Sequence, residues 1–488
     1  MKHLLLILCI IISNKINAQE SYLFNKTYKP DTINLLSPAC LPVYGGYLFT
    51  GSFTSYITEK RGFYVRKTDF QGETLWFKSY EYGNHGIFAI GGGILIEGHI
   101  QTTYLLASSR SYEGSEEVDI VLIHFLQDGT PLWTNYIEQP DSVEGVYHIS
   151  PTTDGGYIMC GLKRGFTSNG RFYVLKVDEL GNMEWDKVYY PDAHGAAFNV
   201  RERENDYLVS GGFFFQETNY DAVVLSINKA DGSENWMQQF GNDEADTACT
   251  IKIDANNNIF ALYAIRDVYS NKYPVIAKLD MNGNTILSKT YNNEVSAPQE
   301  APLVLKPDGG VIGMFSVKNE FGKRYPSIWS FDAQGDTLWT RTVPDLNPNQ
   351  NWYLKDIAAT PDGGYILSGF NYSTQSSWIV KTDSLGYTCN YLGCEETISS
   401  STTTTLAPTN FSTLHPKPNP STGQLNIHNP STKTHLWQLY NAQGQACWQQ
   451  NLAPQSSQTI NLHHLPKGIY FWRLGKYSGK LLLNSPIN

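Results

Sequence analysis

The chain has 488 residues, 41% hydrophobic and 13% aromatic, which is enough to build a large core and one further small domain. Only 17% of the residues are charged and the formal net charge is −10, which argues against nucleic acid or an anionic membrane surface as a partner. The acidic balance mainly favours solubility.

Residues 1–18 have the composition of a secretory signal peptide. A charged start at 1–3 precedes a short apolar run at 4–12, and Ala18 followed by Gln19 offers a cleavage site after a small residue. The apolar run is too short to span a membrane, and no later stretch approaches 18 apolar residues. We therefore expect cleavage between Ala18 and Gln19 and a mature protein without a transmembrane segment.

A repeat of about 50 residues fills most of the chain that follows. Glycines at the ends of turns, most of them opened by Asp, recur at near-constant spacing, and the first six are followed four positions later by Trp or Leu. The glycines are Gly72, Gly129, Gly181, Gly232, Gly283, Gly335 and Gly386, and the residues beyond them are Trp76, Trp133, Trp185, Trp236, Leu287 and Trp339. A fixed period of this length marks units that must stack to bury their apolar faces.

Each unit is predicted to form four short β-strands separated by turns. Residues 154–156 supply an Asp-Gly-Gly hairpin turn, 172–178 are a β-branched and aromatic run, and the next turn follows at 178–181. Trp185 and Tyr189 then share one face of the fourth strand, because strand side chains alternate with period two. Sheets stacked face to face need such large flat side chains at matched heights.

The two ends of the repeat array are complementary. Residues 22–28 have the pattern of a fourth strand without a preceding turn, whereas the last unit has its third strand at 377–383 but no fourth. The N-terminal strand can complete the last sheet, which closes a ring and removes two exposed edges. We predict an all-β chain with a seven-bladed β-propeller at 19–394. The repeats resemble those of tryptophan-docked, quinoprotein-like and other Asp-Gly-rich propellers in general shape; an open β-solenoid is the structural alternative.

Six cysteines remain once the signal peptide is removed, along an oxidising route. Cys389 and Cys394 close a short loop after the last blade, where a disulfide would clamp the end of the ring. The others are scattered over different units and are predicted to be buried thiols, namely Cys40, Cys160, Cys249 and Cys447. No closely spaced Cys or His pairs suggest a zinc site.

Two segments follow the propeller. Residues 395–414 are rich in Ser and Thr, a composition that buries too little apolar surface to offset chain ordering, and are predicted to be a linker. Residues 415–488 contain strand-like runs at 437–440 and 469–473. Pro and Gly would turn these strands into a small β-sandwich.

The C-terminal segment also carries five sequence elements in a fixed order. Their residues include Pro418, Asn419, Pro420, Gly423, Tyr440, Gly444, Leu465, Gly468, Tyr470 and Lys480. In order and spacing they resemble the type A C-terminal sorting domain of the Bacteroidetes type IX secretion system. The resemblance implies a Gram-negative bacterium, Sec export, folding in the periplasm and passage across the outer membrane by the type IX machinery. It also implies removal of the tail, with release or attachment at the cell surface.

The repeats contain no recognisable catalytic constellation. A nucleophile elbow, a phosphate loop and a dinucleotide fingerprint are all missing, and we predict no cofactor. Histidines occur singly and are expected to be structural, as at His85, His99, His124, His148 and His194. The Asp residues that recur in turns are expected to accept backbone N–H bonds, as at Asp69, Asp178, Asp280, Asp332 and Asp383. For Asp280, a turn is favoured over a calcium loop.

Departures from the repeat are the better guide to function. The extra length between Gly72 and Gly129 falls within 101–117, which includes Tyr104, Arg110, Tyr112 and Glu113, and insertions in arrays often map to a binding face. An unordered surface loop is nevertheless the favoured interpretation of this segment. Separately, five Asp-Ser/Thr-apolar triplets resemble the Bacteroidetes O-glycosylation acceptor. They begin at Asp31, Asp141, Asp246, Asp336 and Asp383.

The sequence leaves three functions open. The first is an exported binding module with a glycan, peptide or protein ligand on one propeller face. The alternative is an extracellular polysaccharide hydrolase or lyase using carboxylates such as Glu113, Glu116 or Glu117, for which an axial pocket with two carboxyl groups about 5 to 10 Å apart would be diagnostic. A redox propeller with a quinone is a distant third, because no residues provide a recognisable grip for one.

Overall fold

The structure is a computed structural model, in which a defined set of residues is described. These are 23–29, 33–55, 61–81, 94–99, 103–111, 117–216, 219–242, 244–295, 303–318, 321–343, 349–388, 395–398, 404–406, 421, 423–429, 433–441, 445–474 and 477–483. The predicted signal peptide with Ala18 and Gln19, and the predicted disulfide partners Cys389 and Cys394, lie outside them. The described residues include no helix long and apolar enough to cross a membrane.

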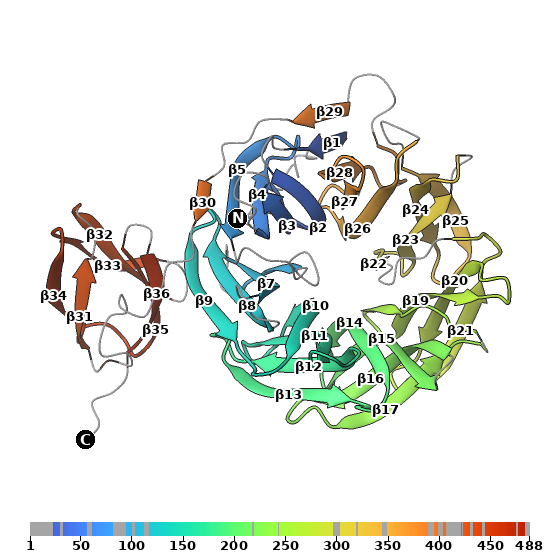
Figure 1. Cartoon of the computed structure of the whole chain (residues 1–488), viewed down its shortest axis with the longest axis horizontal. Helices are drawn as coiled ribbons and strands as arrows, with labels where there is room; N and C mark the ends of the chain where they lie inside the picture. Colours follow the sequence, from blue (N-terminus) through green and yellow to red (C-terminus); the bar gives the residue numbers. More distant parts are fainter. Residues whose placement is uncertain are drawn as a thin grey trace, which may run out of the picture.

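Seven antiparallel sheets of four strands surround a central opening, as Figure 1 shows. From the innermost strand outward, blade 1 is β2 (Ile33–Val43), β3 (Gly46–Ser55), β4 (Arg61–Thr68) and β5 (Thr74–Glu81). Blade 2 is β6 (Ile94–Glu97), β7 (Thr103–Ser111), β8 (Val118–Leu126) and β9 (Pro131–Ile137). Blade 3 is β10 (Val143–Pro151), β11 (Tyr157–Arg164), β12 (Arg171–Val177) and β13 (Met183–Tyr189). One bridge, Val118 to Val143, joins blades 2 and 3.

The remaining blades repeat this order. Blade 4 is β14 (His194–Glu202), β15 (Asp206–Gln216), β16 (Asn219–Asn228) and β17 (Glu234–Phe240). Blade 5 is β18 (Thr250–Ile253), β19 (Ile259–Arg266), β20 (Lys272–Leu279) and β21 (Thr285–Thr290). Blade 6 is β22 (Leu303–Leu305), β23 (Val311–Lys318), β24 (Arg324–Phe331) and β25 (Thr337–Thr342). Blade 7 is β26 (Trp352–Ala359), β27 (Tyr365–Asn371), β28 (Ser376–Thr382) and β1 (Phe24–Tyr28).

The ring is closed by its N-terminal strand, as predicted. Strand β1 pairs antiparallel with β28, in a register that sets Phe24 opposite Lys381 and Tyr28 opposite Ser377. The indole N–H of Trp378 donates a hydrogen bond to the Asn25 side-chain oxygen. The first strand of the propeller is therefore the outer strand of its last blade, and the seven-bladed fold is confirmed.

The recurring glycine and tryptophan pack against each other across neighbouring blades. A Cβ atom on Gly181 of blade 3 would lie 3.1 Å from the ring of Trp133 in blade 2, and Gly181 has a φ of +77°, which also favours glycine. At the closure, Gly72 of blade 1 lies against Phe24 of β1 in the same way, and the hydroxyl of Tyr28 donates to the Gly72 carbonyl at 2.5 Å. These turns therefore pack against large side chains of the blade before them.

The two faces of the ring differ in their connections. Strand direction alternates, so the turns after the first and third strands of each blade lie on one face, here called the turn face. In these turns Asp178 Oδ1 accepts N–H bonds from Leu180 and Asn182, both at 2.8 Å, and the other recurring Asp residues do the same as predicted. The opposite, loop face carries the second-to-third-strand hairpins and the connections between blades.

The Ser- and Thr-rich stretch contains two short strands that its composition did not predict. Strand β29 (Glu395–Ile398) pairs in parallel with β1, and β30 (Thr404–Leu406) pairs in parallel with β5. Each adds a fifth strand to the outer edge of a blade through backbone pairing.

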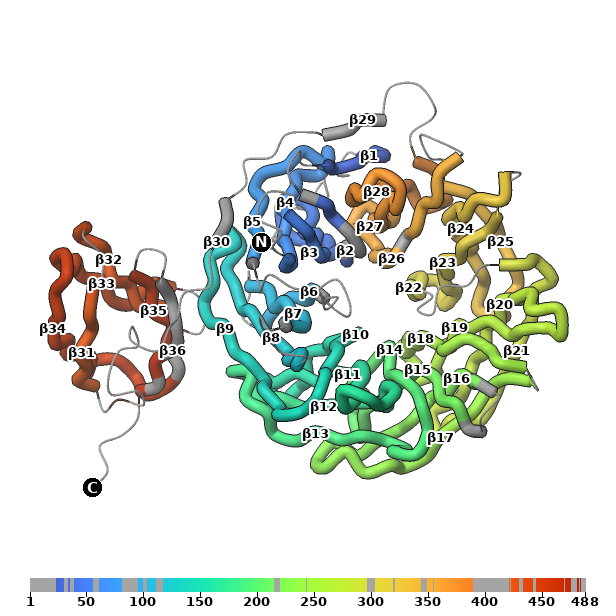
Figure 2. The backbone as a smooth tube through the Cα atoms, viewed as in Figure 1, coloured from blue at the N-terminus to red at the C-terminus, as the bar shows by residue number. Residues whose placement is uncertain are grey.

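The C-terminal unit is a small β-sandwich. One sheet is β31 (Gln424–Asn429) with β34 (Ser456–Asn461), and the other is β33 (Ala446–Leu452), β32 (His435–Tyr440), β35 (Gly468–Leu474) and β36 (Tyr477–Leu483). Trp437 and Trp472 are fully buried between them. The unit lies beside β9 of blade 2 (Figures 1 and 2), where Phe471 joins an apolar cluster with Leu132 and Trp133.

Candidate ligand pocket

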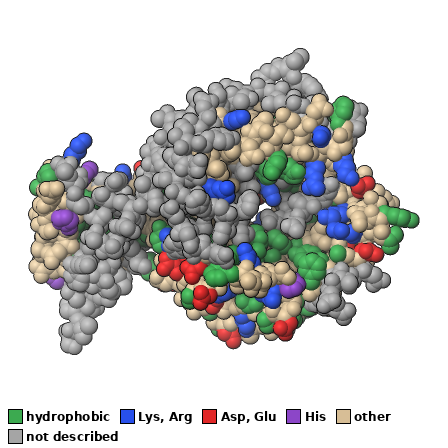
Figure 3. All heavy atoms as spheres, viewed as in Figure 1, with side chains coloured by type: hydrophobic (Ala, Val, Ile, Leu, Met, Phe, Trp, Pro, Cys, Tyr) green, Lys and Arg blue, Asp and Glu red, His purple; other side chains and the backbone are tan. Residues whose placement is uncertain are grey.

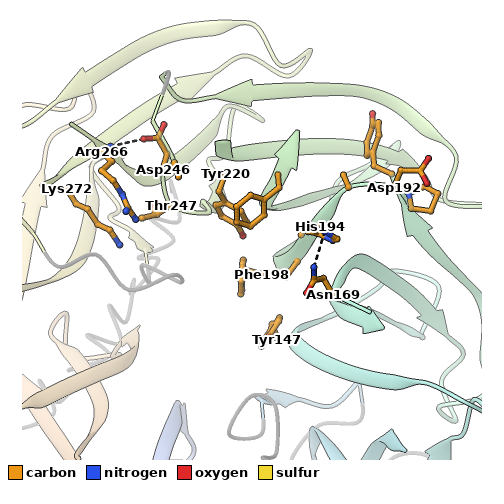
Figure 4. A pocket seen from close by; sticks show the side chains of 18 residues that line it. Tyr147, Asn169, Asp192, His194, Phe198, Tyr220, Asp246, Thr247, Arg266 and Lys272 are labelled. Carbon is orange, nitrogen blue, oxygen red and sulfur yellow. Dashed lines mark hydrogen bonds between the residues drawn. The ribbon is translucent and has the colours of Figure 1, made fainter. Parts of the chain in front are cut away.

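A pocket of about 1200 Å³ opens on the loop face between blades 3, 4 and 5. Its walls come from the β11–β12, β15–β16 and β19–β20 hairpins and from the inter-blade connections β13–β14 and β17–β18, together with inner-strand residues of β10 and β14. None of these connections carries the repeated Asp-Gly turn. Figure 4 labels Tyr147, Asn169, Asp192, His194, Phe198, Tyr220, Asp246, Thr247, Arg266 and Lys272 around it.

Aromatic side chains line the middle of the pocket. Tyr147 and Phe198 pack with ring centroids 4.9 Å apart, and Phe214 and Tyr220 pack edge to face at 4.8 Å. Phe198 is only 7% exposed, whereas Phe214 is 40% exposed at the rim. Figure 4 places Tyr220, Phe198 and Tyr147 in succession across the cavity. The pocket therefore offers a graded apolar surface, from a buried floor to an exposed edge.

Glycine backbones create the room that these rings occupy. A Cβ on Gly212 would lie 2.4 Å from the Tyr220 ring, so only glycine lets this ring lie against the backbone of β15. The N–H of Gly195 donates to the Gly170 carbonyl at 3.0 Å, which links blade 4 to blade 3 beside the pocket. The Gly-Gly pair at 211–212, inside a strand pattern, is the sequence signal that could have indicated this close packing.

His194 is held in a fixed orientation at the exposed rim. Arg171 donates to His194 Nδ1 at 2.8 Å. Nε2 faces the side-chain amide of Asn169 at 3.0 Å. The sequence interpretation of His194 as structural missed this, because Arg171, Asn169 and His194 come from different connections and meet only in the folded ring.

Asp246 is a buried acid that anchors the wall. It is 4% exposed, and its two oxygens accept N–H bonds from Arg266 at 2.7 Å and Asn242 at 2.9 Å. Burial, with a further contribution from the charge of Asp221, raises the pKa of Asp246 to about 6. Both carboxylates approach Gly241, whose Cβ would lie 2.5 Å from Asp221 Oδ1 and 2.6 Å from Asp246 Oδ2. Gly241 thus allows the two acids to sit close together.

The segment singled out for its extra length is mostly strand. Residues 103–111 form β7, Tyr104 is buried at 3% exposure, and Arg110 stacks 3.6 Å from the centroid of Tyr136. Tyr112, Glu113 and Glu116 lie outside the described residues, and Glu117 accepts a bond from the Asp141 N–H at 3.3 Å. The expectation that Tyr104 belongs to an unordered surface loop is wrong, because Tyr104 lies in β7, which pairs with β8.

The other singled-out histidines lie away from the pocket. His99 contacts the Gly156 carbonyl at 2.7 Å, and His124 is buried in blade 2 and bonded to Thr103 at 2.8 Å. His148 shares the central channel with Arg201, Lys252 and Asp356, from the inner strands of blades 3, 4, 5 and 7, and their charges influence one another. His85 lies outside the described residues. Within the described ranges, no three His, Cys, Asp or Glu side chains are grouped to hold a metal ion.

The glycosylation triplets divide by exposure. Ser142 is buried and bonded to Glu144 at 2.5 Å, and Thr247 is buried and bonded to Ala264. Thr337 and Ser384 are exposed, and Thr32 lies outside the described residues. Of the four cysteines predicted as buried thiols, Cys40, Cys160 and Cys249 are free and buried, and Cys447 is free and half-buried.

The predicted sorting residues lie in turns and in the core of the sandwich. Gly423 and Gly468 have φ values of +116° and +146°, which favour glycine, and Leu465 donates its N–H to Leu462. Tyr470 is buried and its hydroxyl donates to the Pro466 carbonyl at 2.7 Å. Tyr440 ends β32 and Lys480 lies in β36. The residues at 418–420 and Gly444 fall outside the described residues.

Solved structures similar to the chain include several propeller-type folds. A protein of unknown function from Dyadobacter fermentans is 11% identical over 74% of this chain and 98% of its own, with a TM-score of 0.42. An ulvan lyase of a polysaccharide lyase family is 10% identical over 74% and 96%, with a TM-score of 0.47. The quinohemoprotein alcohol dehydrogenase of Comamonas testosteroni is 11% identical over 85% and 74%, with a TM-score of 0.43. Identities this low carry nothing about ligand or activity.

No curated protein sequence matches the chain. One family model does match, over residues 418–482, and it is the secretion system C-terminal sorting domain. The match covers the β-sandwich and confirms the resemblance found in its sequence elements. The chain therefore carries a type IX sorting domain behind a propeller, which marks it as a protein that is secreted or attached at the cell surface.

Proposed function

We propose that the exported propeller is a glycan-binding module whose ligand occupies the loop-face pocket. The observation that carries the proposal is the aromatic floor of Tyr147, Phe198 and Tyr220, built entirely from strands and connections that depart from the repeated turns. Scaffold chemistry repeats in every blade, whereas a ligand site needs residues that do not.

A sugar chain suits this surface better than a compact apolar ligand. Sugar rings have C–H faces that stack on aromatic rings, and hydroxyl rims that need hydrogen bonds, which Asn169 and Asp192 offer at the pocket edge. A volume of about 1200 Å³ is larger than most small-molecule sites and has room for several sugar units. Exposed aromatic side chains continue along the loop face at hairpin tips of blades 5, 6 and 7, at Tyr269, Phe321 and Tyr372.

The carboxylates of the pocket favour binding over hydrolysis. Glycoside hydrolysis needs two carboxyl groups free to act on the substrate. In the described lining, Asp192 is exposed, but Asp246 already has each oxygen bonded to a backbone N–H group. A polysaccharide lyase or hydrolase is the alternative function, and cleavage products in the binding mixtures would reveal it.

Glycan-array screening of the full mature chain, followed by calorimetric titration of the best ligand, tests the proposal. We expect Tyr220→Ala to weaken binding by at least about tenfold, since a stacked aromatic contributes of the order of 1 kcal/mol or more beyond its buried area. Tyr44→Ala is the matched control, because Tyr44 is 83% exposed on the turn face. No glycan binding, or equal binding by Tyr220→Ala, would refute the site. Cleavage products in the same mixtures would favour the enzyme.

A further inference from the structure

We propose that the glycan bound in this pocket is acidic, and that Arg266 and Lys272 hold its carboxylate or sulfate group. This inference rests on the proposed function and names the class of its ligand. Arg266 ends β19 and Lys272 begins β20, at the two sides of one hairpin. In Figure 4 both side chains extend into the cavity from the same wall, next to the aromatic floor.

The two cations are placed directly opposite each other. The β19–β20 register pairs Arg266 with Lys272, and residues paired in this way have side chains on the same face with Cβ atoms about 5 Å apart. Like charges at such positions destabilise a sheet. The pocket wall therefore contains like-charge repulsion that a bound anion would remove.

The protein neutralises this pair only in part, because the charge of Arg266 interacts favourably with the nearby carboxylate of Asp246. Among the described residues, neither the guanidinium of Arg266 nor the ammonium of Lys272 makes a salt bridge, and the buried Nε of Arg266 has no acceptor. The two nearby acids are already engaged. Asp246 binds two backbone N–H groups, and Asp267 accepts bonds from Tyr269 and Asn271 in its own turn.

Some other enclosed cations in this chain are paired with acids. Lys176 is paired with Asp154 at 3.0 Å and Glu184 at 2.9 Å, and Lys381 is paired with Asp362 at 2.8 Å. By contrast, Lys272 has two positive neighbours. Burial lowers its pKa, and the charges of Arg266 and Arg324 lower it further. An unpaired guanidinium and ammonium at one end of an aromatic floor match a sugar ring that carries an anionic group at one end.

The test uses the full mature chain and three oligosaccharides of equal length: a neutral one, one containing uronic acid and one carrying sulfate esters. We expect at least one acidic probe to bind about tenfold or more tightly than the neutral one, with affinity that falls as salt rises. Arg266→Gln and Lys272→Gln should each lose about tenfold for that probe and little for the neutral one. Lys318→Gln, at an exposed end of β23, is the control. The two acidic probes separate a carboxylate from a sulfate ligand.

A second measurement does not depend on any ligand. Because each substitution removes like-charge repulsion, both variants should melt at a higher temperature than the wild-type protein without ligand, and Lys318→Gln should not. Equal binding of neutral and acidic probes, still sensitive to Tyr220→Ala, would overturn the acidic ligand and leave glycan binding intact. Unchanged melting temperatures in both variants would contradict the repulsion between Arg266 and Lys272. Absence of binding by all three probes would overturn the acidic ligand. If the glycan array also showed no bound glycan, the proposed function would be overturned as well.

Discussion

Asp246 shows how burial of one residue makes stability depend on pH. Its pKa is raised to about 6 from an ordinary 3.8, so between about pH 4 and 6 the folded chain holds a proton that the unfolded chain has released. Stability therefore rises as pH falls through this window and declines as pH rises. Asp246→Asn should lose this contribution, seen as a smaller change in melting temperature between pH 4 and 7. Parallel wild-type and variant curves would contradict the assignment.

Gly212 is the single residue on which the aromatic floor most depends. A methyl group there would meet the Tyr220 ring at 2.4 Å, which no Cβ contact tolerates, so Gly212→Ala must displace the ring. We expect a loss of glycan affinity similar to that of Tyr220→Ala, with destabilisation of about 1–3 kcal/mol from overpacking. The control is Gly322→Ala at a hairpin tip, where no atom lies within 4 Å of the added methyl but the positive φ imposes strain. A glycan affinity of Gly212→Ala equal to that of Gly322→Ala would contradict this account.

At the scale of elements, the closing strand can be tested through one hydrogen bond. Asn25 on β1 accepts the indole N–H of Trp378 on β28, and both side chains are buried. Asn25→Ala leaves that donor without this acceptor, and we expect a loss of about 1–3 kcal/mol in the free energy of unfolding. Tyr28→Phe, which removes the bond to Gly72, should cost about 1 kcal/mol. Urea denaturation measures both, and an Asn25→Ala value near zero would argue against closure through β1.

The sequence predicted the elements whose pairing is encoded locally. The Asp-Gly turns fix which strands are neighbours, and the glycine four residues before each tryptophan marks where the next blade packs, so the blade count and the closure by β1 followed. Strands β29 and β30 were missed because they pair through their backbone with distant outer strands. The pocket was missed for a similar reason: Tyr147, Tyr220 and Arg266 belong to three blades and have no sequence pattern in common.

At the scale of the whole molecule, the two faces of the ring have separate roles. The turn face repeats the same Asp and Gly contacts in blade after blade, and they stabilise the stack. On the loop face the connections differ from blade to blade, and there the pocket opens. Figure 3 shows hydrophobic side chains gathered below the central opening, and Lys and Arg side chains along its right-hand side. This separation would let the proposed ligand site vary without disturbing the ring.

The sorting unit covers part of blade 2, and its removal should be detectable there. Phe471 of the tail packs against His124 with ring centroids 6.2 Å apart, and burial lowers the pKa of His124 to about 3. Protonation of His124 therefore opposes folding. The stability contributed by the buried neutral imidazole is lost as pH falls from about 6.5 toward 3.

In a chain ending at residue 394, or in Phe471→Ala, water can approach the imidazole of His124, and the pKa of His124 should rise toward 6.5. Titration by NMR measures this. A His124 that still fails to titrate above pH 4 would mean that blade 2 alone buries it, and that the tail is not needed to shield the apolar cluster around Trp133.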